Sequence, residues 1–74
     1  MKEFPEHVDT IRHLKVADEL FRKMFDEYHT VDDAVYRIEE EIDGASDQQF
    51  DELRLRRAQL KDQLYRAIRA AKAA

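Results

Sequence analysis

Apolar residues recur at alternating spacings of three and four through the first half of the chain. They are Leu14, Ala17, Phe21, Met24, Tyr28, Val31, Val35, Ile38 and Ile42. Because two helical turns contain about seven residues, this spacing places the apolar side chains along one narrow stripe of a helix. Such a stripe is buried when the helix packs against another helix. The pattern therefore predicts an all-α, coiled-coil-like protein.

The small size of the chain limits how large a core it can build. It has 74 residues and no cysteine, so neither a disulfide nor a thiolate metal site can add stability. Below about 70–80 residues a single hydrophobic core is marginal, and small chains often gain stability from partner subunits. One glycine, one proline and a charged fraction of 41% are typical of long helices. We therefore expect a single helical domain over residues 1–74 that forms oligomers.

Capping residues divide the chain into three predicted helices. Pro5 suits a first helical turn, and Asp18 is a favourable N-cap that predicts a break in the stripe. Gly44 suits the left-handed position that ends a helix, and Ser46 with Gln49 matches a capping box. The predicted elements are a short helix over residues 5–16, a central helix over 18–42, a turn over 43–46 and a last helix over 47–71.

A turn this short between two long helices allows only an antiparallel return. The last helix carries its own apolar stripe, and the resulting register sets Tyr28 against Leu60 and Met24 against Leu64. We therefore predict an antiparallel helical hairpin with a short N-terminal helix. Its core seam is predicted to contain Phe21, Met24, Tyr28, Val31, Val35, Ile38, Phe50, Leu53, Leu60 and Leu64.

Several apolar residues have no partner in a simple hairpin. The last helix ends opposite Ala17, so the segment before it must fold back, project or contact another chain. Other apolar residues lie beside the seam and would stay partly wet in a monomer. This favours a homodimer or a tetramer, most simply a four-helix bundle. The candidate interaction residues are Phe4, Val8, Ile11, Leu14, Leu20, Phe25 and Ile68.

Arg57 is the one charged residue on the predicted seam. Burying a charge is costly unless the charge is paired. In one interpretation its aliphatic stem packs on Val31 while the guanidinium reaches Asp32 or another acid. In the other, it sets the register or the oligomeric state, as polar core residues do in coiled coils. Arg57 is therefore a candidate residue for register and specificity, and both interpretations stay open here.

Charge is distributed unevenly along the chain. Residues 1–50 contain 6 basic and 14 acidic side chains, whereas residues 51–74 contain 7 basic and 3 acidic ones. Two complementary helices that pack together account for this difference. The alternative is that the basic last helix binds nucleic acid. Single-strand binders usually present several stacking aromatic residues, however, and this helix has only Tyr65 after Phe50.

The sequence carries no pattern typical of an enzyme, a metal site or a membrane segment. A Gly-rich phosphate loop and a nucleophile motif are both missing, and the carboxylates fall on solvated helix faces. Asp26 and His29 have the spacing of ligands in di-metal bundles, but they lie off the seam. No apolar run is long enough for a membrane span or a signal peptide. We expect a non-enzymatic cytoplasmic protein without a cofactor, a metal or a membrane partner.

Short motifs along the chain occur in the same order as in a known family. They are Phe4-Pro5-Glu6-His7, Leu14-Lys15, Phe25-Asp26-Glu27-Tyr28, Ile38-Glu39 and Leu60-Lys61-Asp62. Over nearly its whole length the chain resembles the small bacterial YdcH-like proteins, a family of unknown function. The resemblance implies a helical, coiled-coil-like hairpin and supplies no activity, catalytic residue or ligand. It departs at His29, where the relatives tend to have asparagine.

These patterns together predict a non-enzymatic helical interaction or scaffold module. It is expected to self-associate through its seam and to bind an unidentified protein partner. The alternative function is that of a small nucleic-acid-associated regulator that uses the basic last helix.

Overall fold

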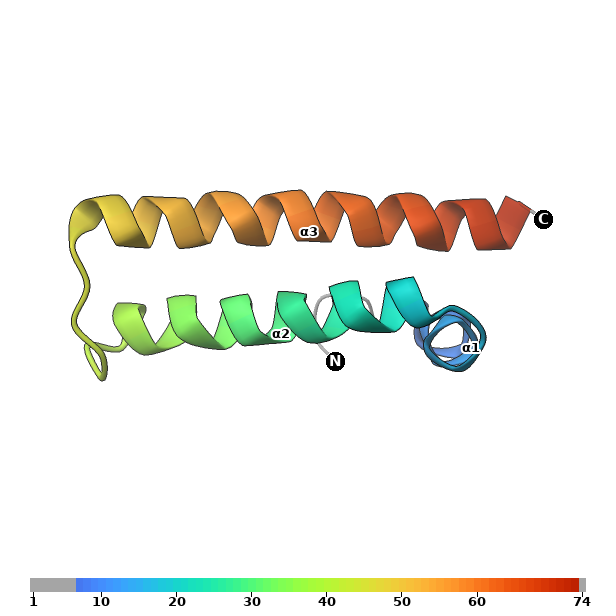
Figure 1. Cartoon of the computed structure of the whole chain (residues 1–74), viewed down its shortest axis with the longest axis horizontal. Coiled ribbons are helices and arrows are strands. Elements are labelled where there is room, and N and C mark those ends of the chain that lie inside the picture. The colour runs from blue at the N-terminus through green and yellow to red at the C-terminus, as the bar shows by residue number, and fades with distance from the viewer. Residues whose placement is uncertain (1–6, 74) are drawn as a thin grey trace.

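The described part of the chain folds into three helices joined by short connections. The computed structural model describes residues 7–73, and this range contains no strand. The helices are α1 (Val8–Ala17), α2 (Glu19–Glu39) and α3 (Asp47–Ala73). Helices α2 and α3 run antiparallel along a molecule of 42 × 19 × 18 Å, and α1 is seen nearly end-on beside the start of α2 (Figure 1). The predicted helical hairpin with a short N-terminal helix is therefore confirmed.

Side-chain caps determine where α2 and α3 begin. The backbone N–H of Phe21 donates to Oδ1 of Asp18 at 3.1 Å, and the extended backbone of Asp18 separates α1 from α2. At α3 the N–H of Gln49 donates to Oγ of Ser46 at 3.2 Å, and the N–H of Ser46 donates to Oε1 of Gln49 at 3.0 Å. This reciprocal pair is the capping box that the sequence predicts.

Helix α2 is shorter than predicted at its C-terminus. The prediction extended it to Ile42, but the helix ends at Glu39. The N–H of Ile42 donates to the carbonyl of Arg37 at 2.8 Å, and the N–H of Glu41 donates to the carbonyl of Ile38 at 3.0 Å. These two bonds form a Schellman motif, which satisfies the last carbonyls of the helix and turns the chain away from its axis.

The left-handed residue of this motif is Glu41, with a φ of 60°, and not the predicted Gly44. The left-handed conformation costs about 1–2 kcal/mol for a residue that carries a Cβ. Gly44 lies further along the connection and has no positive φ, and a Cβ placed on it would meet nothing within 4 Å. The prediction for Gly44 is wrong because the hydrogen bonds that end α2 form before the chain reaches it.

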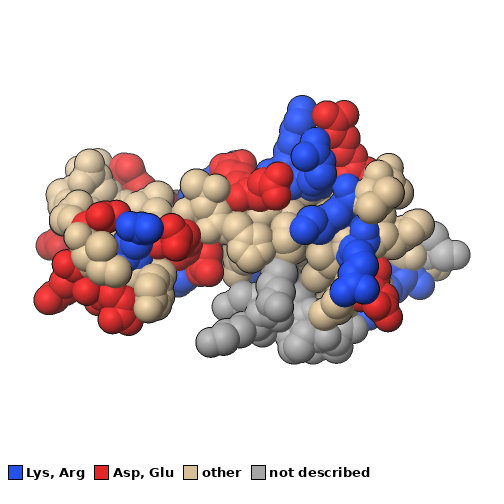
Figure 2. Space-filling view, turned by 90° about the horizontal axis from the view of Figure 1, so that it is seen from below, with Lys and Arg blue, Asp and Glu red and all other residues tan. Residues whose placement is uncertain are grey.

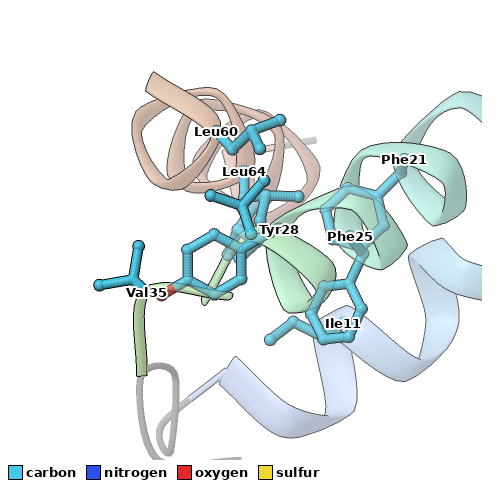
Figure 3. Packing of buried hydrophobic residues seen from close by; sticks show 9 residues of the cluster. Ile11, Phe21, Phe25, Tyr28, Val35, Leu60 and Leu64 are labelled. Carbon is cyan, nitrogen blue, oxygen red and sulfur yellow. The ribbon is translucent and has the colours of Figure 1, made fainter. Parts of the chain in front are cut away.

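The core lies between the helices and takes side chains from all three (Figure 3). Among the described residues it is formed by nine buried ones, namely Ile11, Phe21, Phe25, Tyr28, Val31, Val35, Leu60, Leu64 and Ile68. Among the other predicted seam residues, Met24, Phe50 and Leu53 pack against this cluster while partly exposed, and Ile38 is also half-buried. One chain thus fills the seam with its own helices. Self-association through the seam stays a prediction.

Helix α1 folds back over the open end of the hairpin, the end opposite the turn. Ile11 of α1 is 6% exposed, and it lies beside Phe25 of α2 in the core (Figure 3). Next to α1, Nδ1 of His7 lies 2.6 Å from Nζ of Lys72 near the end of α3. Of the three possibilities that the sequence left open for this segment, the structure shows the first. The part of the predicted first helix before His7 lies outside the described residues.

Within residues 7–73, no helix combines the length and the apolar character that crossing a bilayer requires.

Candidate interaction surface

An open groove of about 590 Å³ lies between α2 and α3 beside the turn. Ala34 and Ile38 line it from α2 and Leu53 lines it from α3, and all three residues are half-buried. Apolar side chains bordered by polar ones are the usual composition of a protein contact site. The remaining lining residues are Asp43, Gly44, Ala45, Gln49, Glu52 and Arg56.

A second apolar feature, Leu20, lies on the same side of α2 near the open end. Leu20 and Ile38 are 18 residues apart, which is about five full turns at 3.6 residues per turn. The two residues therefore share one side of the helix and lie about 27 Å apart along it. Leu20 is largely accessible to solvent, since the residue is 66% exposed. We call the side of the hairpin that carries Leu20 and the groove the groove face.

Helix α1 leaves the groove face uncovered. It packs against Phe25, which is nine residues, or about two and a half turns, from Ala34. Phe25 and Ala34 therefore point to opposite sides of α2. No residue of α1 lines the groove, so within residues 7–73 no further helix packs over the groove face.

The structure separates the predicted interaction residues into two groups. Leu20 and Val8 are exposed, and Leu14 is half-buried against the core. Ile11, Phe25 and Ile68 belong to the core, because α1 closes the end of the hairpin around them. Their assignment to a surface for a partner is corrected here, since it assumed a hairpin without the third helix. Phe4 lies outside the described residues.

Other large apolar side chains are exposed that the predicted interaction set does not contain. Val16 lies near the end of α1, and Ile42 lies in the connection after α2. The regular apolar stripe is interrupted at both places, which is the sequence signal for their exposure. Tyr36 and Leu55 lie beside the seam rather than on it. Their exposed fractions are 88% for Val16, 61% for Ile42, 55% for Tyr36 and 61% for Leu55.

Two neighbouring arginines connect α3 to α2. Nη1 of Arg57 lies 3.1 Å from Oδ1 of Asp32, and Nη2 of Arg56 lies 2.7 Å from Oε2 of Glu27. The side chain of Arg57 is 31% exposed, so its charged end reaches both its partner and solvent. This agrees with the interpretation in which the guanidinium extends out of the seam to Asp32. A role of Arg57 in setting the oligomeric state stays a prediction.

Charge is segregated along the long axis of the molecule. Residues 39–52, at and beside the turn, contain seven acidic side chains and no lysine or arginine. Residues 54–72 of α3 contain seven basic side chains and one acidic one. On the face shown in Figure 2, acidic side chains dominate the turn end, and most lysines and arginines lie toward the open end. The molecule therefore has an acidic turn end and a more basic open end.

A smaller hollow, of about 280 Å³, lies between α1 and α2. Phe25 forms part of its wall and is enclosed by two polar residues. Nζ of Lys15 lies 4.7 Å from the centroid of the Phe25 ring, and the ring of His29 lies 4.7 Å from it edge-on. These are cation–π and aromatic packing contacts. The Lys15 contact joins α1 to α2, whereas the His29 contact lies within α2.

Among residues 7–73, no polar or charged residue is buried, and no group of three or more histidine, aspartate or glutamate side chains is arranged to hold a metal ion. Asp26 and His29, which have the spacing of metal ligands, are both exposed. The features that remain are an apolar groove, exposed apolar side chains and two ends of opposite charge.

A family model described as "Protein of unknown function (DUF465)" matches residues 21–68. The matched range begins at Phe21 of α2 and ends at Ile68 of α3, both core residues, and so it covers most of the hairpin. Helix α1 lies outside it. No curated protein and no solved structure matches the chain significantly.

Proposed function

Because the chain belongs to the DUF465 family, whose function is unknown, its membership supplies no activity, and we propose from the geometry that it is a non-enzymatic helical module that self-associates. The name YdcH-like and a bacterial, cytoplasmic origin stay predictions, as does a further protein partner.

The observation that carries this proposal is the uncovered groove face. A single chain leaves Leu20 66% exposed and an apolar groove open on the same side of the hairpin. An apolar surface with a polar border is the kind of surface that proteins bury on association. Isolated exposed leucines are common, so the weight of the argument rests on the combination of groove and side chain.

The size of the core supports the same proposal. Within residues 7–73 nine buried residues form it, and three of them, Ile11, Phe25 and Val31, have exposed fractions of 6%, 5% and 9%. Domains of this length often need a metal, a disulfide or a second subunit. The chain has no cysteine. Burial of the groove face in a dimer supplies additional apolar contact without any change in the fold of one chain.

The nucleic-acid alternative receives less support from the arrangement of α3. Three of its basic residues, Arg56, Arg57 and Arg66, pair with carboxylates of the same chain. Pairing reduces the positive charge that a phosphate backbone would meet, because binding strength follows the number of phosphates neutralised. The basic residues of α3 therefore serve the fold in part, and we make no second proposal.

Light scattering coupled to size-exclusion chromatography tests the proposal. Wild-type protein at high micromolar concentration is expected to elute as a dimer or a larger oligomer. Ile38→Lys places a charge in the groove and is expected to shift the protein toward monomer while helicity is retained. Asp26→Lys, on an exposed position of the same helix, is the matched control and leaves the oligomer unchanged. A folded wild-type monomer at these concentrations would refute the proposal.

A further inference from the structure

The two apolar features of the groove face are placed so that two copies of the chain can complete each other. Leu20 stands near the open end, and the groove around Ile38 stands near the turn, about 27 Å further along α2. A two-fold axis halfway between them, at the level of residue 29, brings Leu20 of one copy over Ile38 of the other. The same operation makes the reciprocal contact, as a two-fold interface requires.

We infer that two copies pair side by side and antiparallel through the groove face, with Leu20 of each copy in the groove beside the turn of the other. This inference rests on the proposed function, because it assigns an orientation and a surface to the self-association proposed above. The occupant of the groove is thus a second copy of this chain.

Charge complementarity favours this orientation over a parallel one. The turn end carries the seven acidic side chains of residues 39–52, without a lysine or arginine among them. The last part of α3, residues 61–72, carries four basic side chains and one acidic one. Antiparallel pairing sets each acidic turn end beside the basic open end of the other copy. Parallel pairing would bring the two acidic turn ends together, which like-charge repulsion disfavours.

The centre of the groove face also suits a two-fold contact. Glu27 of α2 and Arg56 of α3 are paired there at 2.7 Å, with side chains 45% and 43% exposed. Glu27 is seven residues from Leu20 and eleven from Ile38, so it lies close to the proposed axis. The two-fold axis brings the Glu27 residues of the two copies toward each other, and the pairing of each with Arg56 of its own chain offsets their like charge.

Site-directed cross-linking tests the inference, because the chain has no cysteine of its own. Leu20→Cys and Ile38→Cys are made separately, and one of them carries a tag that changes its mass. The two proteins are mixed and treated with a short thiol-to-thiol cross-linker. If the copies pair antiparallel, the cross-linked product between Leu20→Cys and Ile38→Cys is expected in several-fold higher yield than the product of either variant with itself. Asp26→Cys is the control for random collision, and light scattering on the same samples reports whether dimers are present.

The outcomes separate this inference from the proposed function. If dimers are present but each variant cross-links mainly with itself, the antiparallel groove-face contact is overturned. The same holds if no yield exceeds that of the Asp26→Cys control. In both cases the proposed self-association is unaffected. A monomer in light scattering overturns both. A second variant, Glu39→Lys with Glu40→Lys, reverses charge at the turn end, where cations suit the C-terminus of α2. The inference expects several-fold weaker dimerisation from it with unchanged helicity, and unchanged dimerisation would contradict the role of charge.

Discussion

Arg57 of α3 lies 3.1 Å from Asp32 of α2, measured between Nη1 and Oδ1, and the two side chains are 31% and 40% exposed. The pair therefore joins the helices at the edge of the core rather than inside it. Partly exposed ion pairs contribute about 0–1 kcal/mol to stability. The charge of Arg57 therefore contributes little to stability, and the packing of its side chain on the seam contributes more.

Replacing Arg57 with leucine is expected to stabilise the protein. Leucine adds apolar contact on the seam, and Asp32 remains accessible to water. The free energy of unfolding, measured by urea denaturation, should rise by about 1 kcal/mol. Arg69→Leu, on an exposed position of the same helix, should change it by less than about 0.5 kcal/mol. A loss of about 3 kcal/mol or more in Arg57→Leu would instead identify a pair that behaves as buried.

Glu41→Gly is expected to stabilise the end of α2. Glu41 has a φ of 60°, a conformation that glycine adopts without the steric cost of a Cβ. The gain should be about 1 kcal/mol in the free energy of unfolding, read from the thermal or urea midpoint. The comparison variant is Gly44→Ala, at a position with ordinary φ and open space around it. It should be neutral or slightly stabilising. If Glu41→Gly lowers stability, the assigned Schellman end of α2 is wrong.

The break between α1 and α2 depends on the side chain of Asp18. Its Oδ1 accepts a hydrogen bond from the N–H of Phe21 at 3.1 Å. Asp18→Ala removes this acceptor and should cost about 1 kcal/mol, whereas Asp18→Asn retains it and should cost much less. Circular dichroism during urea unfolding measures both. Equal losses in the two variants would show that the carboxylate charge, rather than the cap bond, is responsible.

Residues that the sequence assigned to a partner surface are expected to act on the stability of one chain. Ile11 is 6% exposed and packs in the core with Phe25. Ile11→Ala should therefore cost about 2–5 kcal/mol, and the milder Ile11→Val about 0.5–1.5 kcal/mol. Val16→Ala, at a residue that is 88% exposed, is the matched control and should be nearly neutral. If Ile11→Val lowers the free energy of unfolding no more than Val16→Ala does, the docking of α1 on the hairpin is contradicted.

The hairpin and its helix starts were predictable because their signals are local. Asp18, Ser46 and Gln49 supply caps that act within one turn, and the apolar stripe identifies the packed faces of both long helices. The end of α2 was not predictable in the same way. A glycine was available at position 44, yet the chain closes the helix with Glu41 in the left-handed conformation. The N–H groups of Glu41 and Ile42 already satisfy the last carbonyls of α2 before the chain reaches Gly44. These hydrogen bonds outweigh the local preference for glycine.

The candidate surface was only partly predictable because it depends on how α1 docks. A hairpin alone leaves both sides of α2 exposed. From the sequence, Phe25 and Leu20 are therefore equally good candidates for contact with a partner. Helix α1 covers Phe25 and leaves Leu20 exposed. The direction in which a short helix folds back depends on tertiary packing, and the spacing of its apolar residues does not predict it. The groove likewise cannot be predicted from the sequence, since it depends on how α2, α3 and the turn between them are arranged in space.

Sedimentation equilibrium of the unmodified chain over a range of concentrations tests the central claim of self-association most directly. The account predicts a mass twice or more that of the 8.9 kDa chain, falling toward that of one chain on dilution. Leu20→Lys with Ile38→Lys should remain helical and stay near the mass of one chain at concentrations where the wild type associates. A wild-type protein that is fully helical and keeps the mass of one chain up to high micromolar concentration would contradict the account.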